Sequence, residues 1–85
     1  MKLAFTDSAW DDYLWWQTND KQTLRRINAL ITDVKRSGYT GIGKPEPLKH
    51  SLAGYWSRRI TSEHRLVYVI EDDVVVIISC RYHYE

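Results

Sequence analysis

The second half of the chain holds the side chains whose types and spacing could do chemistry. One carboxylate, Glu46, stands between two prolines, and an arginine-containing run follows at residues 57–65. The C-terminal run, residues 80–85, adds a histidine and an aromatic side chain, His83 and Tyr84. An isolated carboxylate, several guanidiniums, an imidazole and an aromatic ring suit metal-free chemistry on a phosphodiester. Each residue alone has a plainer explanation, because turn carboxylates, surface arginines and solvated chain ends are common.

Composition places these residues on one small domain spanning residues 1–85. The apolar fraction, 44%, is enough for a core without covalent staples. One cysteine excludes an internal disulfide and, with three scattered histidines, excludes a cysteine-rich zinc site, so we expect no metal and no cofactor. Residues 1–5 are too short for the apolar core of a signal peptide, and no run approaches the ~20 apolar residues of a membrane span. We therefore expect a cytoplasmic protein without membrane segments.

Charge is distributed unevenly, although the net charge is only +1. Residues 7–20 contain four aspartates and no basic residue, whereas residues 44–65 contain five Lys or Arg against two Glu. A basic second half is compatible with a localised phosphate-binding surface. The pattern is a weak signal by itself, since basic faces are often merely solvated.

Two helices are predicted in the first half of the chain. The pattern predicts a short strand at residues 2–6, a helix that starts at the capping residues 6–8 and runs to about residue 18, and a second helix that ends at Gly38. Apolar residues form one stripe on the second helix: Leu24, Ile27, Leu30, Ile31 and Val34. Two helices separated by only a few residues should form an antiparallel hairpin.

A loop and three strands are predicted in the second half. Residues 39–54 contain three glycines and two prolines, so we expect a stiff loop that holds Glu46 with little freedom. Strands are predicted at residues 55–61, 65–71 and 74–82, joined as an antiparallel meander.

The register of these strands can be inferred from burial. A three-residue first bend sets Thr61 opposite Arg65. This register gives a core face of Trp56, Ile60, Leu66 and Ile70, and an opposite face of Ser57, Arg59, Arg65 and Val67. For the second bend we predict the same length, which places Val76, Ile78 and Cys80 in the core and Ser79, Arg81 and His83 beside the sheet arginines. A two-residue bend would invert the last strand, and the apolar run at residues 74–78 fits either choice.

Four runs, in this order, closely resemble the YoeB toxins of the RelE/ParE superfamily: residues 43–49 (GKPEPLK), 56–60 (WSRRI), 63–68 (EHRLVY) and 81–84 (RYHY). The likeness extends along essentially the whole chain. It implies a RelE-like α+β fold in the order β-α-α-β-β-β, with a two-helix hairpin packed on an antiparallel sheet. It also implies the toxin of a type II toxin–antitoxin system, an endoribonuclease that cleaves mRNA in the ribosomal A site, inhibits translation and is neutralised by a YefM-like antitoxin.

The resemblance carries the catalytic positions onto Glu46, Arg65, His83 and Tyr84. In metal-independent RNA cleavage the 2′-hydroxyl is the nucleophile. Glu46 is then the candidate general base and His83 the candidate general acid. Arg65 would clamp the phosphate oxygens, and Tyr84 would stack on a base or orient the nucleotide. Further basic residues are expected to contact RNA: Lys44, Lys49, Arg58, Arg59 and Arg81. The family's chains usually end at the tyrosine, so the additional Glu85 puts the electrostatics near His83 in question.

Two other classes of function stay open on the sequence alone. One is a non-catalytic module that inhibits by occupying a partner, as the ParE-type gyrase poisons do, although those lack this acid–base set. The other is a degenerate toxin that serves as an antitoxin-binding regulator, for which Glu85 is the only hint.

Partner surfaces are predicted more coarsely. We expect the antitoxin to cross the basic face of the sheet, and the family likeness alone implies a possible homodimer. Trp10 and Tyr13 are expected in the core, and one of Trp15 and Trp16 at a subunit or antitoxin interface. His64 is expected to be an ordinary bend residue, with a contact to RNA left open.

Overall fold

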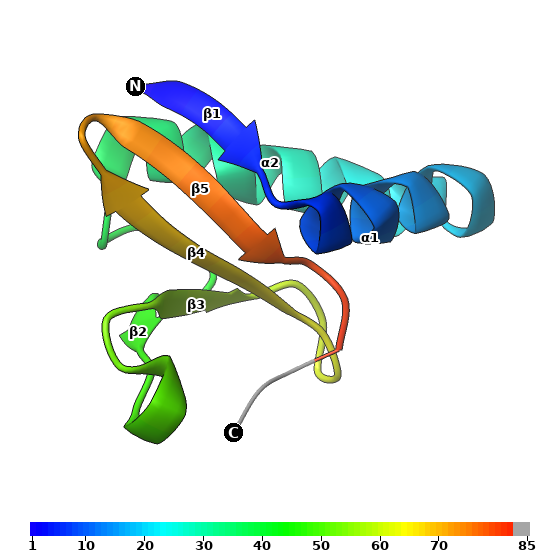
Figure 1. Cartoon of the computed structure of the whole chain (residues 1–85). Coiled ribbons are helices and arrows are strands. Elements are labelled where there is room, and N and C mark those ends of the chain that lie inside the picture. The colour runs from blue at the N-terminus through cyan, green and yellow to red at the C-terminus, as the bar shows by residue number, and fades with distance from the viewer. Residues whose placement is uncertain (83–85) are drawn as a thin grey trace.

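The computed structural model describes residues 1–82 and places two helices against one face of a mixed sheet (Figure 1). In chain order the elements are β1 (Lys2–Phe5), α1 (Asp7–Asn19), α2 (Lys21–Ser37), β2 (Glu46–Pro47), the 3₁₀ helix η1 (His50–Leu52), β3 (Trp56–Arg59), β4 (Arg65–Glu71) and β5 (Val74–Ser79). The strands are ordered β1-β5-β4-β3-β2 in the sheet. The predicted α+β class, with a helix pair between the first strand and the rest, is confirmed.

Local signals start and stop the two helices. The Thr6 hydroxyl accepts the N–H of Ala9 at the start of α1, and the Asp20 carboxylate accepts the N–H of Thr23 at the start of α2. Gly38 follows α2 with a φ of 68°, and its N–H donates to a carbonyl of the last turn. The predicted helix pair is therefore confirmed. Neither helix is long and apolar enough to cross a membrane.

The sheet differs from the predicted antiparallel meander at both edges. β1 pairs with β5 in parallel, so the sheet is mixed. At the other edge, Glu46 and Pro47 form β2 inside the segment predicted as a loop, opposite Ser57 and Trp56 of β3. A two-residue strand containing proline is typical of a sheet edge, because proline has no N–H for the ladder.

β3 and β4 pair two residues away from the predicted register. Arg59, and not Thr61, lies opposite Arg65. The connection is longer than predicted because residues 60–64 form a bend, in which the Thr61 hydroxyl accepts the N–H of His64. Since side chains alternate with a period of two, a shift of two residues leaves the same residues on each face. The predicted faces of these two strands are therefore correct, although the register was wrong.

The connection between β4 and β5 is shorter than predicted. The aspartates at 72–73 form a two-residue bend, both with positive φ (51° and 62°), as tight hairpins require. Val75 and Ile77 are consequently fully buried, and the prediction that Val76 and Ile78 face the core was wrong.

An irregularity in the β4–β5 ladder restores the predicted orientation at the end of β5. The register shifts between Val67 and Tyr68, so that Ser79 lies opposite Val67 on the face away from the helices. Cys80 is fully buried in the core, as predicted. Bulges of this kind re-aim the residues that follow them.

The hydrophobic core lies between the sheet and the helices that cover one of its faces (Figure 1). Its fully buried members include Ala9, Ile27, Leu30, Val34, Leu66, Tyr68, Val75 and Ile77. Trp10 is not among them: its exposed fraction is 46%, so the prediction that it is a core residue was wrong. Tyr13 packs against the core from a half-buried position.

Candidate functional site

The face of the sheet away from the helices brings Glu46 into line with three further strands. Glu46 lies opposite Ser57, Ser57 opposite Val67, and Val67 opposite Ser79. Residues directly opposite each other in antiparallel strands point to the same face, with Cβ atoms about 5 Å apart. Glu46 is thus the exposed end of a row whose inner members are buried.

Two arginines lie beside this row. Arg59 and Arg65 are directly opposite each other, and each is two residues along its strand from a member of the row, so they share the face of Glu46. Like charges directly opposite each other destabilise a strand pair. An anion bound between the two guanidiniums would offset that repulsion, and a phosphate has the matching geometry.

The bend before β4 fixes the guanidinium of Arg65. Its Nη1 atom donates to three backbone carbonyls of residues 61–64, at 3.0 to 3.4 Å. Within residues 1–82, Arg65 forms no ion pair with Glu63 or Glu71, the carboxylates near it in the sequence. The guanidinium is therefore held in place by neutral acceptors and keeps its positive charge uncompensated by these carboxylates.

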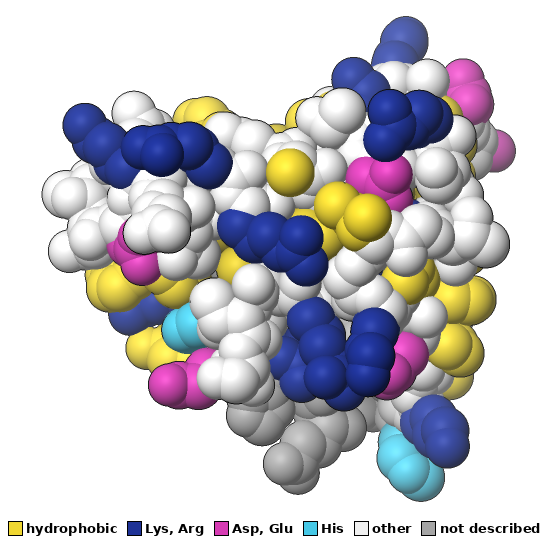
Figure 2. Space-filling view, turned by 180° about the vertical axis from the view of Figure 1, so that it is seen from behind, with side chains coloured by type: hydrophobic (Ala, Val, Ile, Leu, Met, Phe, Trp, Pro, Cys, Tyr) yellow, Lys and Arg dark blue, Asp and Glu magenta, His cyan; other side chains and the backbone are white. Residues whose placement is uncertain are grey.

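Two exposed lysines flank β2. Lys44 precedes Glu46 with a φ of 52°, and Lys49 lies directly before η1. The Gly43 carbonyl accepts the N–H of Arg59 at 2.7 Å, which ties the start of this segment to β3. Basic side chains also gather in other groups over the side of the molecule shown in Figure 2. Positive charge is therefore not confined to the candidate site. What distinguishes the site is that basic side chains surround the carboxylate of Glu46.

Arg58 does not contact solvent, so the prediction that it binds RNA was wrong. It alternates with the outward-facing Arg59, and its fully buried guanidinium forms an ion pair with Asp33 of α2. Its other acceptors are the Tyr68 hydroxyl (3.1 Å) and the carbonyls of Gly38 (2.8 Å), Thr40 and Ile42 (3.1 Å). A buried charge is tolerated only when it is paired and hydrogen-bonded in this way.

This ion pair sets the path of the segment that leads to β2. The hydrogen bond from Arg58, followed by those from Arg36 and the Ile42 N–H, lowers the pKa of Asp33 to about 2. Gly41 has a φ of 117°, and a Cβ there would collide with the Asp33 carboxylate. Residues 38–43 thus wrap around the ion pair. The ion pair thereby fixes where the chain begins its approach to β2.

Side chains of α1 hold the residues that follow β5. The N–H of Cys80 donates to the Asp12 carboxylate at 3.0 Å, and its carbonyl accepts the indole N–H of Trp16 at 2.8 Å. Burial, with the Asp12 charge as a smaller cause, raises the pKa of the Cys80 thiol to about 12. The thiol therefore stays protonated and serves as a core side chain rather than a nucleophile.

The bend before β4 holds the same segment from the other side. The N–H of Tyr82 donates to Nδ1 of His64 at 2.7 Å, and the carbonyl of Tyr82 accepts the N–H of Arg65 at 2.8 Å. Nothing in the sequence pattern predicted this role for His64. His83 and Tyr84 lie outside the described residues, so their roles stay predictions.

Arg81 contacts aromatic side chains. Its guanidinium lies 3.7 Å from the ring centroid of Trp15 on α1 and 4.8 Å from that of Tyr82. We predicted that it lies beside the sheet arginines; its charge is instead engaged by a cation–π contact with a helix. Trp16 is buried and Trp15 is 38% exposed, so Trp15 is the one of the two that is available to a partner.

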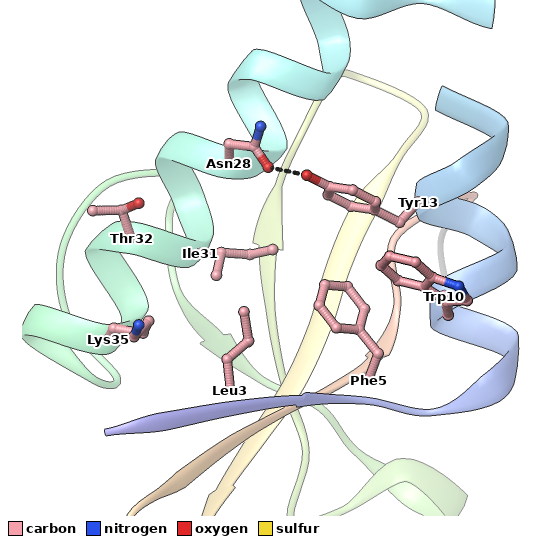
Figure 3. A pocket seen from close by; sticks show the side chains of 8 residues that line it. All are labelled: Leu3, Phe5, Trp10, Tyr13, Asn28, Ile31, Thr32 and Lys35. Atoms are coloured by element: carbon pink, nitrogen blue, oxygen red, sulfur yellow. Dashed lines mark hydrogen bonds between the residues drawn. The ribbon is translucent and has the colours of Figure 1, made fainter. Parts of the chain in front are cut away.

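A groove of about 470 Å³ lies apart from these residues, among β1, α1 and α2 (Figure 3). Its lining residues are Leu3, Phe5, Trp10, Tyr13, Asn28, Ile31, Thr32 and Lys35. The Trp10 and Tyr13 rings stack with centroids 5.6 Å apart, and the Tyr13 hydroxyl donates to the Asn28 side chain at 2.7 Å. No carboxylate or imidazole is in this lining, so the groove lacks the side chains predicted for the acid–base chemistry. In the described part of the chain, no three His, Cys, Asp or Glu side chains are placed to hold a metal ion.

Known proteins are similar to this chain in sequence and in fold over nearly their full length. Residues 5–84 match the model of the YoeB-like toxin of bacterial type II toxin–antitoxin systems. Toxin YoeB of Synechocystis sp. is 64% identical over 100% of this chain and 99% of its own. A YoeB/ParE toxin structure from Agrobacterium tumefaciens superposes with a TM-score of 0.96, at 52% identity over 99% of this chain and 100% of its own.

Two similar solved structures from Staphylococcus aureus are assemblies, one with a second kind of chain and one a dimer. A YoeB–YefM complex has a TM-score of 0.91 at 47% identity, and a YoeB dimer has 0.92 at 48%; both cover 99% of this chain and 98% of the matched chain. The likeness in sequence and the likeness in fold both extend along the whole chain. The chain therefore belongs to the YoeB family, the toxins of bacterial type II toxin–antitoxin systems.

Proposed function

We propose that this toxin is a metal-independent endoribonuclease that cleaves mRNA in the A site of cytoplasmic ribosomes. The observation that carries the proposal is the common face of Glu46, Arg59 and Arg65, beside the segment that leads into His83. That face combines an exposed carboxylate with two opposed guanidiniums, which suits a phosphodiester. Membership in a family of toxins supports an activity that harms the cell when it is unrestrained.

The proposed reaction needs one base, one acid and cations around the phosphate. Glu46 takes the proton of the 2′-hydroxyl, whose oxygen attacks the neighbouring phosphorus. The P–O5′ bond breaks, His83 gives its proton to the departing 5′-oxygen, and a 2′,3′-cyclic phosphate remains on the upstream fragment. Arg65 contacts the non-bridging oxygens with Arg59 as the second cation, and preorganisation by the bend carbonyls lowers the cost of binding the transition state. Tyr84 stacks on the unpaired base or orients the nucleotide.

The test is to map 5′ ends on a message translated in vitro with the toxin added. We expect new ends at codons in the A site with the wild type. Arg65→Ala should lower the cleavage rate by about 10²–10³, the usual cost of losing a preorganised transition-state contact. His83→Gln should lower it at least as far. Arg25→Ala is the matched control, because Arg25 is an exposed arginine on α2, and it should leave the rate unchanged.

Two results would overturn the proposal. Wild-type rates in both Arg65→Ala and His83→Gln would remove the assigned roles. Intact mRNA together with gyrase-linked DNA breaks would instead favour a non-catalytic inhibitor of the ParE type.

We also propose a YefM-like antitoxin as the partner, since the S. aureus relative forms a complex with YefM. Complementary charge would bring an acidic or apolar segment across Arg59 and Arg65 and over the segment after β5. Mixing the two proteins should slow amide hydrogen exchange in β3, β4 and residues 80–82. Unchanged exchange there, with slowed exchange elsewhere, would place the antitoxin on another surface.

A further inference from the structure

His64 is built into the molecule by its backbone, its ring and one ring nitrogen. Its N–H donates to the Thr61 hydroxyl (3.1 Å), and its carbonyl accepts the N–H of Ile60 (2.9 Å). Its ring meets Trp16 edge-on, with centroids 4.8 Å apart and planes at 90°. Nδ1 of the ring accepts the Tyr82 N–H at 2.7 Å. The imidazole is thus fixed to the bend and to α1, and its Nδ1 atom binds the C-terminal segment.

Tyr82 has an unfavourable backbone conformation that these contacts maintain. Its φ is 63°, a left-handed value that costs a non-glycine residue free energy. Both polar groups of its backbone are bound by consecutive residues: the N–H by His64 at the end of the bend and the carbonyl by Arg65 at the start of β4. The backbone of Tyr82 is therefore held by the same part of the chain that fixes the Arg65 guanidinium.

We propose that His64 is a positioning residue, which orients the C-terminal segment by accepting the Tyr82 N–H at Nδ1. The proposal rests on the proposed cleavage, because its consequence is the placement of His83 relative to Arg65. An Nδ1 that accepts a hydrogen bond carries no proton, so His64 is neutral with its proton on Nε2 in this state.

Two substitutions separate the acceptor from the bulk of the ring. His64→Asn places an amide oxygen near the position of Nδ1, and it does not titrate. His64→Phe keeps an aromatic ring against Trp16 and has no acceptor. Because both variants lack the imidazole, a difference between them reports on the acceptor alone. Thermal unfolding of both variants checks that the fold persists.

The first measurement is the protection of the Tyr82 amide against hydrogen exchange, by NMR on the whole chain at pH 7.5. The wild type should protect this amide roughly tenfold more than His64→Phe does, the effect of about one net hydrogen bond. His64→Asn should restore most of that protection, because its amide oxygen can accept the Tyr82 N–H. Equal protection in the wild type and His64→Phe, or protection in His64→Asn no greater than in His64→Phe, would overturn the proposal.

The second measurement is cleavage of a translated message by the same proteins. His64→Phe should lower the turnover rate while leaving ribosome binding unchanged, and His64→Asn should restore it at pH 7.5. A His64→Phe rate equal to that of the wild type would overturn the positioning role. If the wild type cleaves no message, the proposed function fails, and the Tyr82 amide still decides whether His64 anchors the segment.

Discussion

Arg59 and Arg65 show how a residue pair can favour function over stability. They lie directly opposite each other on adjacent strands, an arrangement that costs free energy while no anion is present. The guanidinium of Arg65 is held by neutral carbonyls, and within residues 1–82 neither arginine forms an ion pair. The repulsion is therefore retained in the free protein, and under the proposed function a bound phosphate would relieve it.

The pair predicts a trade-off that Arg59→Gln can reveal. Removing one of two opposed charges should leave the free energy of unfolding unchanged or raise it by about 0.2–1 kcal/mol. The same substitution should lower the cleavage rate, because one cation near the phosphate is lost. Urea unfolding and the translation assay measure the two effects, with Arg25→Gln as the control for loss of an exposed arginine. A clear loss of stability in Arg59→Gln would contradict the repulsion argument.

Whether the role of a site residue could be predicted depends on how far along the sequence its contacts lie. The shared face of Arg59 and Arg65 could be predicted from the sequence, because it follows from the alternation of side chains along each strand. The placement of Glu46 on the same face could not, because β2 lies in a segment predicted as a loop. Arg58 was misassigned even though that alternation points it inward, because its partner, Asp33, lies on a helix 25 residues earlier. No sequence pattern predicts the role of His64, since that role depends on the path of the chain after β5.

Among the elements, the helices and the irregular segments differ in how far sequence determines them. Helix ends follow from capping residues such as Thr6, Asp20 and Gly38, whose signals act within a turn. The lengths of the bends depend on pairing between strands, which no local signal shows. The five consecutive apolar residues of β5 could place either alternate set of side chains in the core. The parallel placement of β1 also joins segments far apart, so no local pattern announces it.

The segment that leads to β2 depends on the ion pair of Arg58 and Asp33, which predicts a specific acid sensitivity. The folded pKa of Asp33, about 2, lies below its ordinary value of 3.8. Its charge therefore stabilises the fold above about pH 4, and that contribution is lost as the pH falls from about 4 to about 2.

Asp33→Asn tests this contribution. The variant should be less stable than the wild type at pH 7, and its stability should fall less steeply between pH 4 and pH 2. Chemical unfolding at several pH values measures both slopes. Asp11→Asn, which removes an exposed carboxylate of α1, should keep the wild-type slope. Parallel slopes for the wild type and Asp33→Asn would show that the pair does not depend on the charge of Asp33.

At the scale of the whole molecule, two surfaces are separated by the core. The helix-free face carries the proposed chemistry, and the groove with Trp10 lies among β1, α1 and α2. Leu3 and Trp10 in its lining are 39% and 46% exposed, an apolar surface suited to a partner. We propose that a second copy of this chain contacts this groove.

Trp10→Arg tests the groove as a dimer interface. A charge in an apolar contact should raise the dimer dissociation constant by tenfold or more, because it must be desolvated without a partner. Sedimentation equilibrium measures the change, and Arg25→Glu, on an exposed position of α2, controls for altered charge. An unchanged dissociation constant in Trp10→Arg would place the dimer interface elsewhere.

The parallel pairing of β1 with β5 has a consequence for biosynthesis. The Thr6 hydroxyl donates to the carbonyl of Ile78, 72 positions later, and within the sheet β1 has β5 as its one neighbour. A nascent polypeptide therefore cannot complete its sheet until β5 has left the exit tunnel. The sheet, and with it the proposed site, therefore forms only when synthesis of the chain is essentially complete.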